Sequence, residues 1–335
     1  MQVIYYKSPS GNFGDDLNAV LWRQLLPPEA FAADDAVLLG IGSIFREDFL
    51  SQSATADKRV FVLGSGAGTG PLPAAWPDPG WNILAVRGPL TARVIGRPDS
   101  SVTDAAALLA LTPEITPAAP DRRDVLFMPH YNSVPASRWP HICAELGFTF
   151  VDMRWSPEVV LRMLGSARLV ITEAMHGAIV ADTLRIPWIP LVCSPEIAAF
   201  KWVDWASSLD LPYEPVHIPP SSAWEAFRHR RLNASKGFPS TGAGLSDADL
   251  IDEFQRTFGE AEAGIPEPSR SRKAAGWMLS KASTVFDRLF ENRAAEALQA
   301  AAAGPQYLSG DRVLANRVGR LEQAVTDLRR ALGVS

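Results

Sequence analysis

Short apolar runs alternate with amphipathic stretches along most of the chain. In the first half these runs, each predicted to be a buried strand, lie at 3–6, 36–42, 60–66, 83–88 and 101–109. A second series of such runs lies at 124–130, 148–153, 167–177 and 187–193. Strands that alternate with helices are typical of parallel βαβ units. The pattern therefore predicts an α/β fold with two successive Rossmann-like halves.

Two stretches rich in proline and charge interrupt this pattern, TPEITPAAPDRR at 112–123 and AEAGIPEPSRSRKA at 262–275. Such composition is typical of linkers. We therefore predict an N-terminal Rossmann-like domain at 1–115, a C-terminal one at 124–262, and a helical tail at 263–335. Because ligands of open α/β sheets bind beyond the carboxyl ends of the strands, we expect a cleft shared by both domains.

The tail carries a regular apolar stripe. Its members recur at alternating steps of four and three, the spacing of a coiled-coil seam, at Leu314, Val318, Leu321, Val325, Leu328 and Leu332. The seam predicts either a homo-oligomer, formed by helices that pair between chains, or docking on the same chain. The regularity of the spacing favours pairing between chains.

An earlier part of the tail, Arg270 to Phe290, places apolar residues on one helical face behind a basic start. Such a helix can lie on an anionic membrane surface, which would make the protein peripheral at the inner membrane. Docking on the protein's own body is the simpler interpretation.

Composition narrows the class of protein. The 335 residues are 47% hydrophobic and carry a formal net charge of -5, which argues against a nucleic-acid partner. The two cysteines, Cys143 and Cys193, lie in apolar settings, so neither a disulfide framework nor a metal site is expected. The start of the chain reads as a strand rather than an export signal, and no apolar run is long enough to span a bilayer. These features predict a cytoplasmic protein.

Three predicted strands end in glycine-rich turns, at 11–16, 40–43 and 64–68. Each turn alone is equally well a tight turn or a ligand loop, because glycine permits both positive φ and close approach of a ligand. Three such turns at corresponding strand ends favour ligand loops, although none has the dinucleotide-binding spacing. The candidate substrate-binding residues there are Asn12, Asp15, Gly42, Ser43 and Gly66.

Arg87 follows another strand, in AVRGPLTA, where a guanidinium can pair with a carboxylate or a phosphate. The alternative is a surface salt bridge. In the following VTDAAALL, Asp104 is better interpreted as the cap of a helix than as a catalytic group.

The most informative stretch is ITEAMHGAIVAD at 171–182, an apolar strand that ends in a carboxylate and an imidazole before a small-residue helix. Glu173 and His176 are therefore candidate acid/base residues at a strand's carboxyl end. A histidine is, however, more often an ordinary core or surface residue.

Three further residues follow strands of the second half. Lys201 and Trp202 lie in FKWVDW, where a lysine can bind phosphate and a tryptophan can stack on a sugar, although packing inward is as good an interpretation of the aromatic residues. His130 in HYN can line the cleft, or the segment can be a simple turn.

Taken together, these stretches resemble the polysaccharide pyruvyl transferase family. The resemblance rests on GNFGDDLN, the glycine-ended strands, the pair VRGPLTA and VTDAAALL, and above all TEAMHGAIVADTLRIPW, and it covers the chain to about residue 260. The blocks EAMHGAIVADTLRIPW and FKWVDWASSL are most similar to the branch that forms pyruvate ketals on exopolysaccharides such as xanthan and succinoglycan.

The resemblance implies two Rossmann-like domains in a glycosyltransferase-B-like arrangement, no cofactor, phosphoenolpyruvate as donor, and a saccharide acceptor that is free or lipid-linked. It also implies His176 and Glu173 as acid and base, in either order, with Arg87 and Lys201 around the donor's charges. Many family members carry arginine where this chain has Ala174, which leaves the donor-binding cation open. The alternatives are a sugar-nucleotide glycosyltransferase of the same architecture and a non-enzymatic assembly scaffold.

Overall fold

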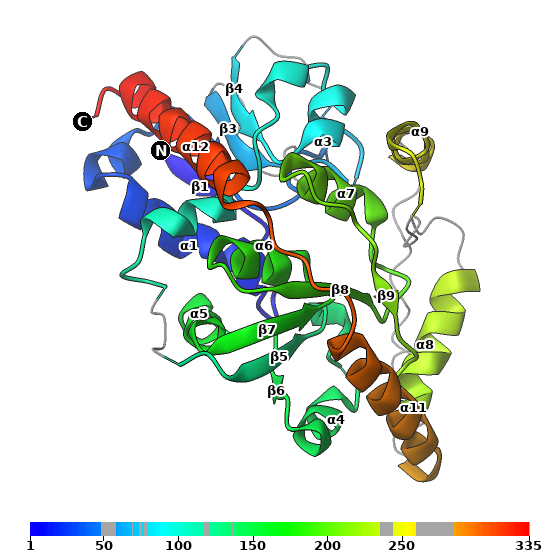
Figure 1. Ribbon diagram of the computed structural model, residues 1–335. Helices are drawn as coiled ribbons and strands as arrows, with labels where there is room; N and C mark the ends of the chain where they lie inside the picture. The colour runs from blue at the N-terminus through cyan, green and yellow to red at the C-terminus, as the bar shows by residue number, and fades with distance from the viewer. Residues whose placement is uncertain are drawn as a thin grey trace.

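The computed structural model of the chain describes residues 1–47, 58–68, 70–73, 76, 80–116, 121–135, 137–234, 244–258 and 284–334. It has two parallel sheets with helices around them, as the alternating pattern predicts (Figure 1). The predicted membrane-facing stretch that starts at Arg270 lies outside the described residues as far as residue 283.

The N-terminal sheet has four parallel strands in the order β1-β2-β3-β4. They are β1 (Gln2–Ile4), β2 (Ala36–Leu39), β3 (Arg59–Ser65) and β4 (Trp81–Val86). The prediction of a strand over 101–109 is wrong. Only Ser101 bridges to Val86, and a 3-10 helix, η3 (Ala105–Leu111), begins where the Asp104 side chain caps it. The run of alanines after this cap has no β-branched residue to favour a strand.

The C-terminal sheet has five parallel strands in the order β6-β5-β7-β8-β9. They are β5 (Asp124–Met128), β6 (Thr149–Phe150), β7 (Ala167–Thr172), β8 (Trp188–Val192) and β9 (Val216–His217). The sequence pattern did not reveal β9, which is only two residues long. The direction of winding reverses between β5 and β7, and such a switch point opens a crevice at the carboxyl ends of the two strands.

The inner strands of each sheet are buried on both faces, which explains why they are continuously apolar, whereas the edge strands β1, β4, β6 and β9 are partly exposed. In β3, Phe61 and Leu63 face a core shared with the C-terminal domain, whereas Val60 and Val62 face the outer side. Between the sheets lie η3 and three helices, α1 (Phe13–Leu25), α5 (Pro157–Gly165) and α6 (Met175–Thr183). The domains therefore meet across a packed helical layer.

The remaining described helices cover the outer faces and the domain edges. They are η1 (Pro28–Ala32), α3 (Pro89–Val94), η2 (Pro98–Ser100), η4 (Tyr131–Ser133), α4 (Trp139–Leu146), α7 (Ala199–Ser208), α8 (Ala223–Ala234), α9 (Asp247–Phe258), α11 (Thr284–Ala302) and α12 (Asp311–Leu332). Helix α7 lies between β8 and β9 of the C-terminal sheet in the chain but packs on α3 of the N-terminal domain, and α9 packs on both.

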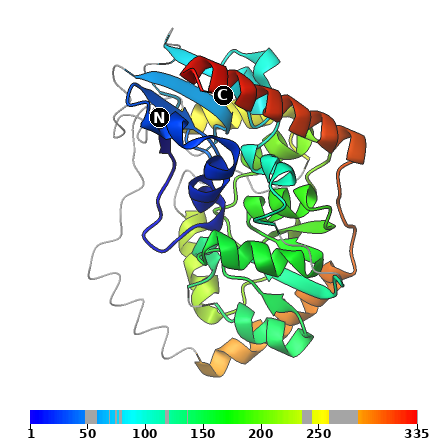
Figure 2. The ribbon, with the colours of Figure 1, turned by 90° about the vertical axis from the view of Figure 1, so that its left-hand side faces the viewer.

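The apolar stripe of α12 is buried within its own chain. The helix lies across the N-terminal domain, against β3, β4 and η3 (Figures 1 and 2), and Leu321 and Leu328 have no exposed surface. Two hydrogen bonds tie its end to the N-terminal domain: the Arg59 guanidinium donates to the Ala331 carbonyl, and the Arg329 guanidinium donates to the Leu25 carbonyl. The expectation that this seam pairs between chains is therefore corrected to docking on the same chain. Helix α11 packs instead on α4 and α8 of the C-terminal domain. Among the described residues, no helix is both long and apolar enough to cross a membrane.

Candidate active site

A cavity of about 250 Å³ lies where the two domains meet. The N-terminal domain lines it with Tyr6, Asn12, Asp15, Ser43, Ile44 and Arg46, and the C-terminal part of the chain lines it with His130, Tyr131, Met153, Ala174, Met175, His176 and Lys201. Several of these residues follow the carboxyl ends of β1, β2, β5 and β7. The cavity therefore occupies the position expected for a ligand, and it includes the switch point between β5 and β7.

His176 lies in the first turn of α6 and reaches this cavity. The turn before it is held by Thr172, whose hydroxyl donates to the Met128 carbonyl and accepts from the Ala174 amide, each at 3.0 Å. The imidazole packs directly on Gly14 of α1, where any Cβ atom would overlap its Nδ1 atom. The ring therefore fits only because residue 14 is glycine.

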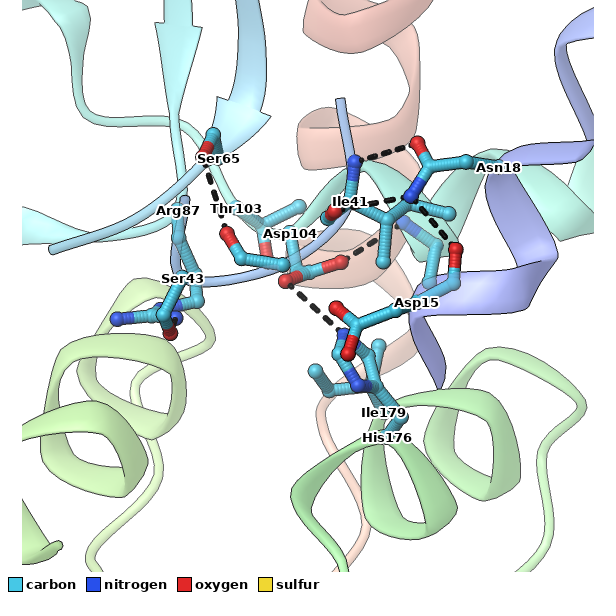
Figure 3. A network of polar contacts seen from close by, with 12 residues as sticks. Asp15, Asn18, Ile41, Ser43, Ser65, Arg87, Thr103, Asp104, His176 and Ile179 are labelled. Atoms are coloured by element: carbon cyan, nitrogen blue, oxygen red, sulfur yellow. Dashed lines mark hydrogen bonds and ion pairs between the residues drawn. The ribbon is translucent and has the colours of Figure 1, made fainter. Parts of the chain in front are cut away.

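Asp104 faces His176 from the other domain (Figure 3). Its Oδ1 atom accepts from the Ala106 amide at 2.9 Å, which confirms that Asp104 caps η3. Its Oδ2 atom lies 3.8 Å from Nε2 of His176. The cap and the contact with the histidine thus use different oxygens of one carboxylate, a combination that the sequence did not suggest.

Asp15 is a second acid beside His176. Burial raises the pKa of Asp15 to about 6, and the neighbouring His176 and Lys201 oppose that rise. The side-chain amide of Asn12 donates to its Oδ2 atom. Gly42 has a φ of 117°, and a Cβ there would lie 2.6 Å from Oδ1 of Asp15. The glycine at this position therefore lets the loop after β2 approach the carboxylate.

Two cations line the same cavity, Lys201 from α7 and Arg46 from the loop after β2. Burial lowers the pKa of Lys201 to about 8, Arg87 adds to the lowering, and Asp15 opposes it. Of these two, only Lys201 was predicted from the sequence. Arg46 follows the glycine-rich turn at 40–43, and its closeness to that turn was the available signal.

Arg87 does not line the cavity, and the prediction that it binds a ligand directly is corrected. The guanidinium is fully buried, donating to Asp204 at 3.0 Å, to the Ser43 hydroxyl at 2.8 Å and to the Ala67 carbonyl at 2.6 Å. A Cβ at Gly66 would overlap this guanidinium, so Gly66 makes room for Arg87 rather than for a ligand. Ser43 itself does line the cavity.

Glu173 is also not a cavity residue, and its prediction as the acid or base beside His176 is wrong. Its fully buried carboxylate accepts from the backbone amides of His130 at 3.0 Å, Cys193 at 2.8 Å and Ser194 at 2.7 Å. Burial raises the pKa of Glu173, while these amides oppose the rise. The residue joins the loops that follow β5, β7 and β8.

Trp202 belongs to the core, so its prediction as a sugar-stacking residue is wrong. It is 1% exposed and stacks on Tyr213 with ring centroids 5.1 Å apart. His130 does line the cavity, as predicted. Its Nδ1 atom accepts from the Asn132 amide at 3.4 Å. Burial lowers the pKa of His130 to about 3, with help from Lys201 and Arg228, so this imidazole is neutral at physiological pH.

Sequence reasoning did not single out Tyr6 or Asp204. Tyr6 ends the first apolar run, so its position after β1 was the available signal. Asp204 accepts from Arg87 and from the amide and hydroxyl of Thr91 across the domain boundary. No local pattern in α7 distinguishes it from a solvent-facing aspartate.

Known sequences define the class of this protein. The family model for polysaccharide pyruvyl transferase matches residues 5–195, a range that contains every cavity residue except Lys201. The chain therefore belongs to the polysaccharide pyruvyl transferase family, which confirms the resemblance drawn from its motifs.

One relative matches nearly the whole chain. The chain is 33% identical over 331 residues to the succinoglycan biosynthesis protein ExoV of Rhizobium meliloti (strain 1021), covering 98% of this chain and 99% of that protein. No solved structure matches the chain significantly.

Proposed function

We propose that this protein transfers the pyruvyl group of phosphoenolpyruvate to a sugar of an exopolysaccharide and forms a pyruvate ketal. The family supports pyruvyl transfer, and the name of the relative supports an exopolysaccharide as the acceptor. The observation that carries the proposal is the joining of acid/base groups and cations at one cavity: His176 and Asp15 with Lys201 and Arg46.

The cations suit the donor, because phosphoenolpyruvate carries a carboxylate and a phosphate close together. Lys201 and Arg46 supply two positive groups on the wall of a cavity where burial strengthens electrostatic attraction. Ala174, where many relatives carry arginine, lines the same cavity and adds no charge. In this proposal Lys201 and Arg46 replace that arginine.

The first step protonates the methylene carbon of the donor. We assign the donation of this proton to His176. Once the methylene carbon is protonated, the central carbon becomes electrophilic and a sugar hydroxyl can add to it. Asp15, whose pKa is raised to about 6 by burial, accepts the proton of that hydroxyl and passes it to His176.

The second step releases phosphate and closes the ketal. The bond between the central carbon and the phosphate oxygen breaks, and a second hydroxyl of the sugar adds in its place. The reaction consumes one proton at the methylene carbon and releases two from the hydroxyls. One of these restores His176, and the other leaves on the phosphate, so protons balance over the cycle.

The site of action is part of the proposal. Phosphoenolpyruvate is an intracellular metabolite, so we place the reaction in the cytoplasm. The acceptor is a free or a lipid-linked saccharide, and a lipid-linked one would bring the protein to the cytoplasmic face of the inner membrane.

A donor assay tests the proposal against its alternatives. The purified protein is incubated with saccharide extracted from a strain that lacks this chain, together with phosphoenolpyruvate or with a mixture of sugar nucleotides. Release of inorganic phosphate that depends on the saccharide supports pyruvyl transfer. Release of nucleoside diphosphate would instead identify a glycosyltransferase, and turnover of neither donor would favour a scaffold.

A further inference from the structure

Two buried polar atoms face each other across the domain boundary without a hydrogen bond. They are Oδ2 of Asp104, at the start of η3, and Nε2 of His176, in α6. Among the described residues neither atom has any hydrogen-bond partner, and the two lie 3.8 Å apart. A buried polar atom without a partner is costly, and few survive in native structures.

The gap is slightly too long for a hydrogen bond. Donor and acceptor atoms of an N–H···O bond are usually about 2.7–3.2 Å apart, so an approach of roughly 1 Å would complete this one. Bonds between catalytic groups are often long in unliganded enzymes and tighten when substrate binds. Since the two residues come from different domains, a small closure around a ligand is sufficient.

Asp104 is the group best placed to accept a hydrogen bond from Nε2 of His176, because its unpaired Oδ2 atom faces that nitrogen. The other oxygen of Asp104 is engaged by the Ala106 amide. The charged groups in this region are Asp15 and Asp16 from α1, Asp104 from η3, Lys201 from α7, and Arg46, which lines the same cavity. The opposite edge of the ring, with Nδ1, packs on Gly14.

We infer that Asp104 is a positioning residue, which holds the Nε2–H of His176 and leaves Nδ1 as the nitrogen that exchanges protons with the reactants. A neutral histidine that donates from Nε2 carries its lone pair on Nδ1, and a protonated one is stabilised by the facing carboxylate. The inference rests on the proposed function and deepens it, because it names the atom of His176 that works as acid and base.

The substitution Asp104→Asn separates this role from the helix cap. Asparagine is as good an N-cap as aspartate, so the bond to the Ala106 amide and the thermal stability are retained. Its amide group facing Nε2 would instead favour the wrong tautomer. We expect kcat/KM for phosphoenolpyruvate to fall at least about a hundredfold, as for other histidines that lose their orienting carboxylate. The matched control is Asp99→Asn at an exposed position of η2, for which we expect an unchanged kcat/KM.

The rate of Asp104→Asn is measured beside its thermal stability. A lower kcat/KM at unchanged stability supports positioning of His176, and a wild-type kcat/KM in the variant would overturn the inference.

Nuclear magnetic resonance of nitrogen-labelled histidine tests the inference without any turnover. His176 is assigned by its absence in His176→Ala. We expect the neutral ring to carry its proton on Nε2 in the wild type and to shift it towards Nδ1 in Asp104→Asn. The same tautomer in both proteins would refute the role of Asp104, even if pyruvyl transfer is confirmed. If the tautomer of His176 changes as expected but the protein does not turn over phosphoenolpyruvate, only the proposed function is refuted.

Discussion

The Nε atom of Arg87 lies 3.0 Å from Oδ2 of Asp204, and both side chains are fully buried where α7 packs on the N-terminal domain. The ion pair is completed by Thr91, whose hydroxyl donates to the same oxygen at 2.6 Å. Lys201 lies one helical turn before Asp204, so the pair fixes the helix that carries a cation of the cavity. Arg87 thus contributes to the site by holding α7 and Ser43.

This arrangement predicts that Arg87→Ala acts mainly on stability. Removing one partner of a buried ion pair leaves the other charge buried and unpaired, which typically costs about 3–5 kcal/mol. We expect a loss of this size in the free energy of unfolding, measured with urea. The control is Arg93→Ala, which breaks the exposed pair with Asp247 and should cost less than about 1 kcal/mol. A stable Arg87→Ala protein with weakened donor binding would restore Arg87 as a ligand-binding residue.

The contact between Gly14 and His176 gives a second prediction. In Gly14→Ala the new methyl group would overlap the imidazole and displace it, so pyruvyl transfer should fall at least as far as in Asp104→Asn. The control is Gly319→Ala in α12, where a Cβ meets nothing within 4 Å. This change should raise helix stability by up to about 1 kcal/mol and leave activity unchanged. Full activity of Gly14→Ala would mean that the position of the ring is unimportant.

The lowered pKa of Lys201 predicts how donor binding depends on pH. A lysine is charged below its pKa, and burial lowers the pKa of Lys201 to about 8. The KM for phosphoenolpyruvate should therefore rise as pH increases through about 8. Because an arginine stays charged, Lys201→Arg should move this rise to higher pH, and Lys201→Met should bind the donor weakly at every pH. The exposed Lys7→Arg change serves as control. A KM independent of pH in the wild type would contradict this assignment.

Burial of the α12 stripe predicts a large effect of a single leucine. Leu321→Ala should lower the free energy of unfolding by about 2–5 kcal/mol, because it opens a cavity against the N-terminal domain. Leu289→Ala is the control, since that side chain is 62% exposed. Light scattering should give the same mass for both variants and the wild type. A lower mass in Leu321→Ala alone would show that the stripe also joins two chains.

The sequence predicted the local elements of the fold better than their partners. Periodicity located eight of the nine described strands, because buried parallel strands are continuously apolar. Periodicity predicted a strand over 101–109, although the cap interpretation of Asp104 already indicated a helix after it, where the structure has a 3-10 helix. The spacing of the α12 stripe was read correctly as one apolar face. What that face packs on depends on the tertiary fold, which spacing alone does not encode.

Part of the candidate site was predicted as well, because the residues that follow strand ends can be recognised locally. Strand ends and glycine turns identified Asn12, Asp15, Ser43, His130 and Lys201, all of which line the cavity with His176. Residue type alone misassigned Arg87, Glu173 and Trp202, because a charged or aromatic side chain after a strand can equally well turn inward. Asp104 is the opposite case, since its cap was predicted and its contact with His176 required the other domain.

The central claim is that this cavity transfers the pyruvyl group of phosphoenolpyruvate. The most direct test uses phosphoenolpyruvate labelled with heavy carbon at all positions of its pyruvyl group, the purified protein, and saccharide from a strain that lacks the chain. Mass spectrometry of the saccharide should show the complete label, gained together with an equal amount of released phosphate, with no gain for His176→Ala. Phosphate release without label in the saccharide, or equal labelling by His176→Ala, would contradict the account.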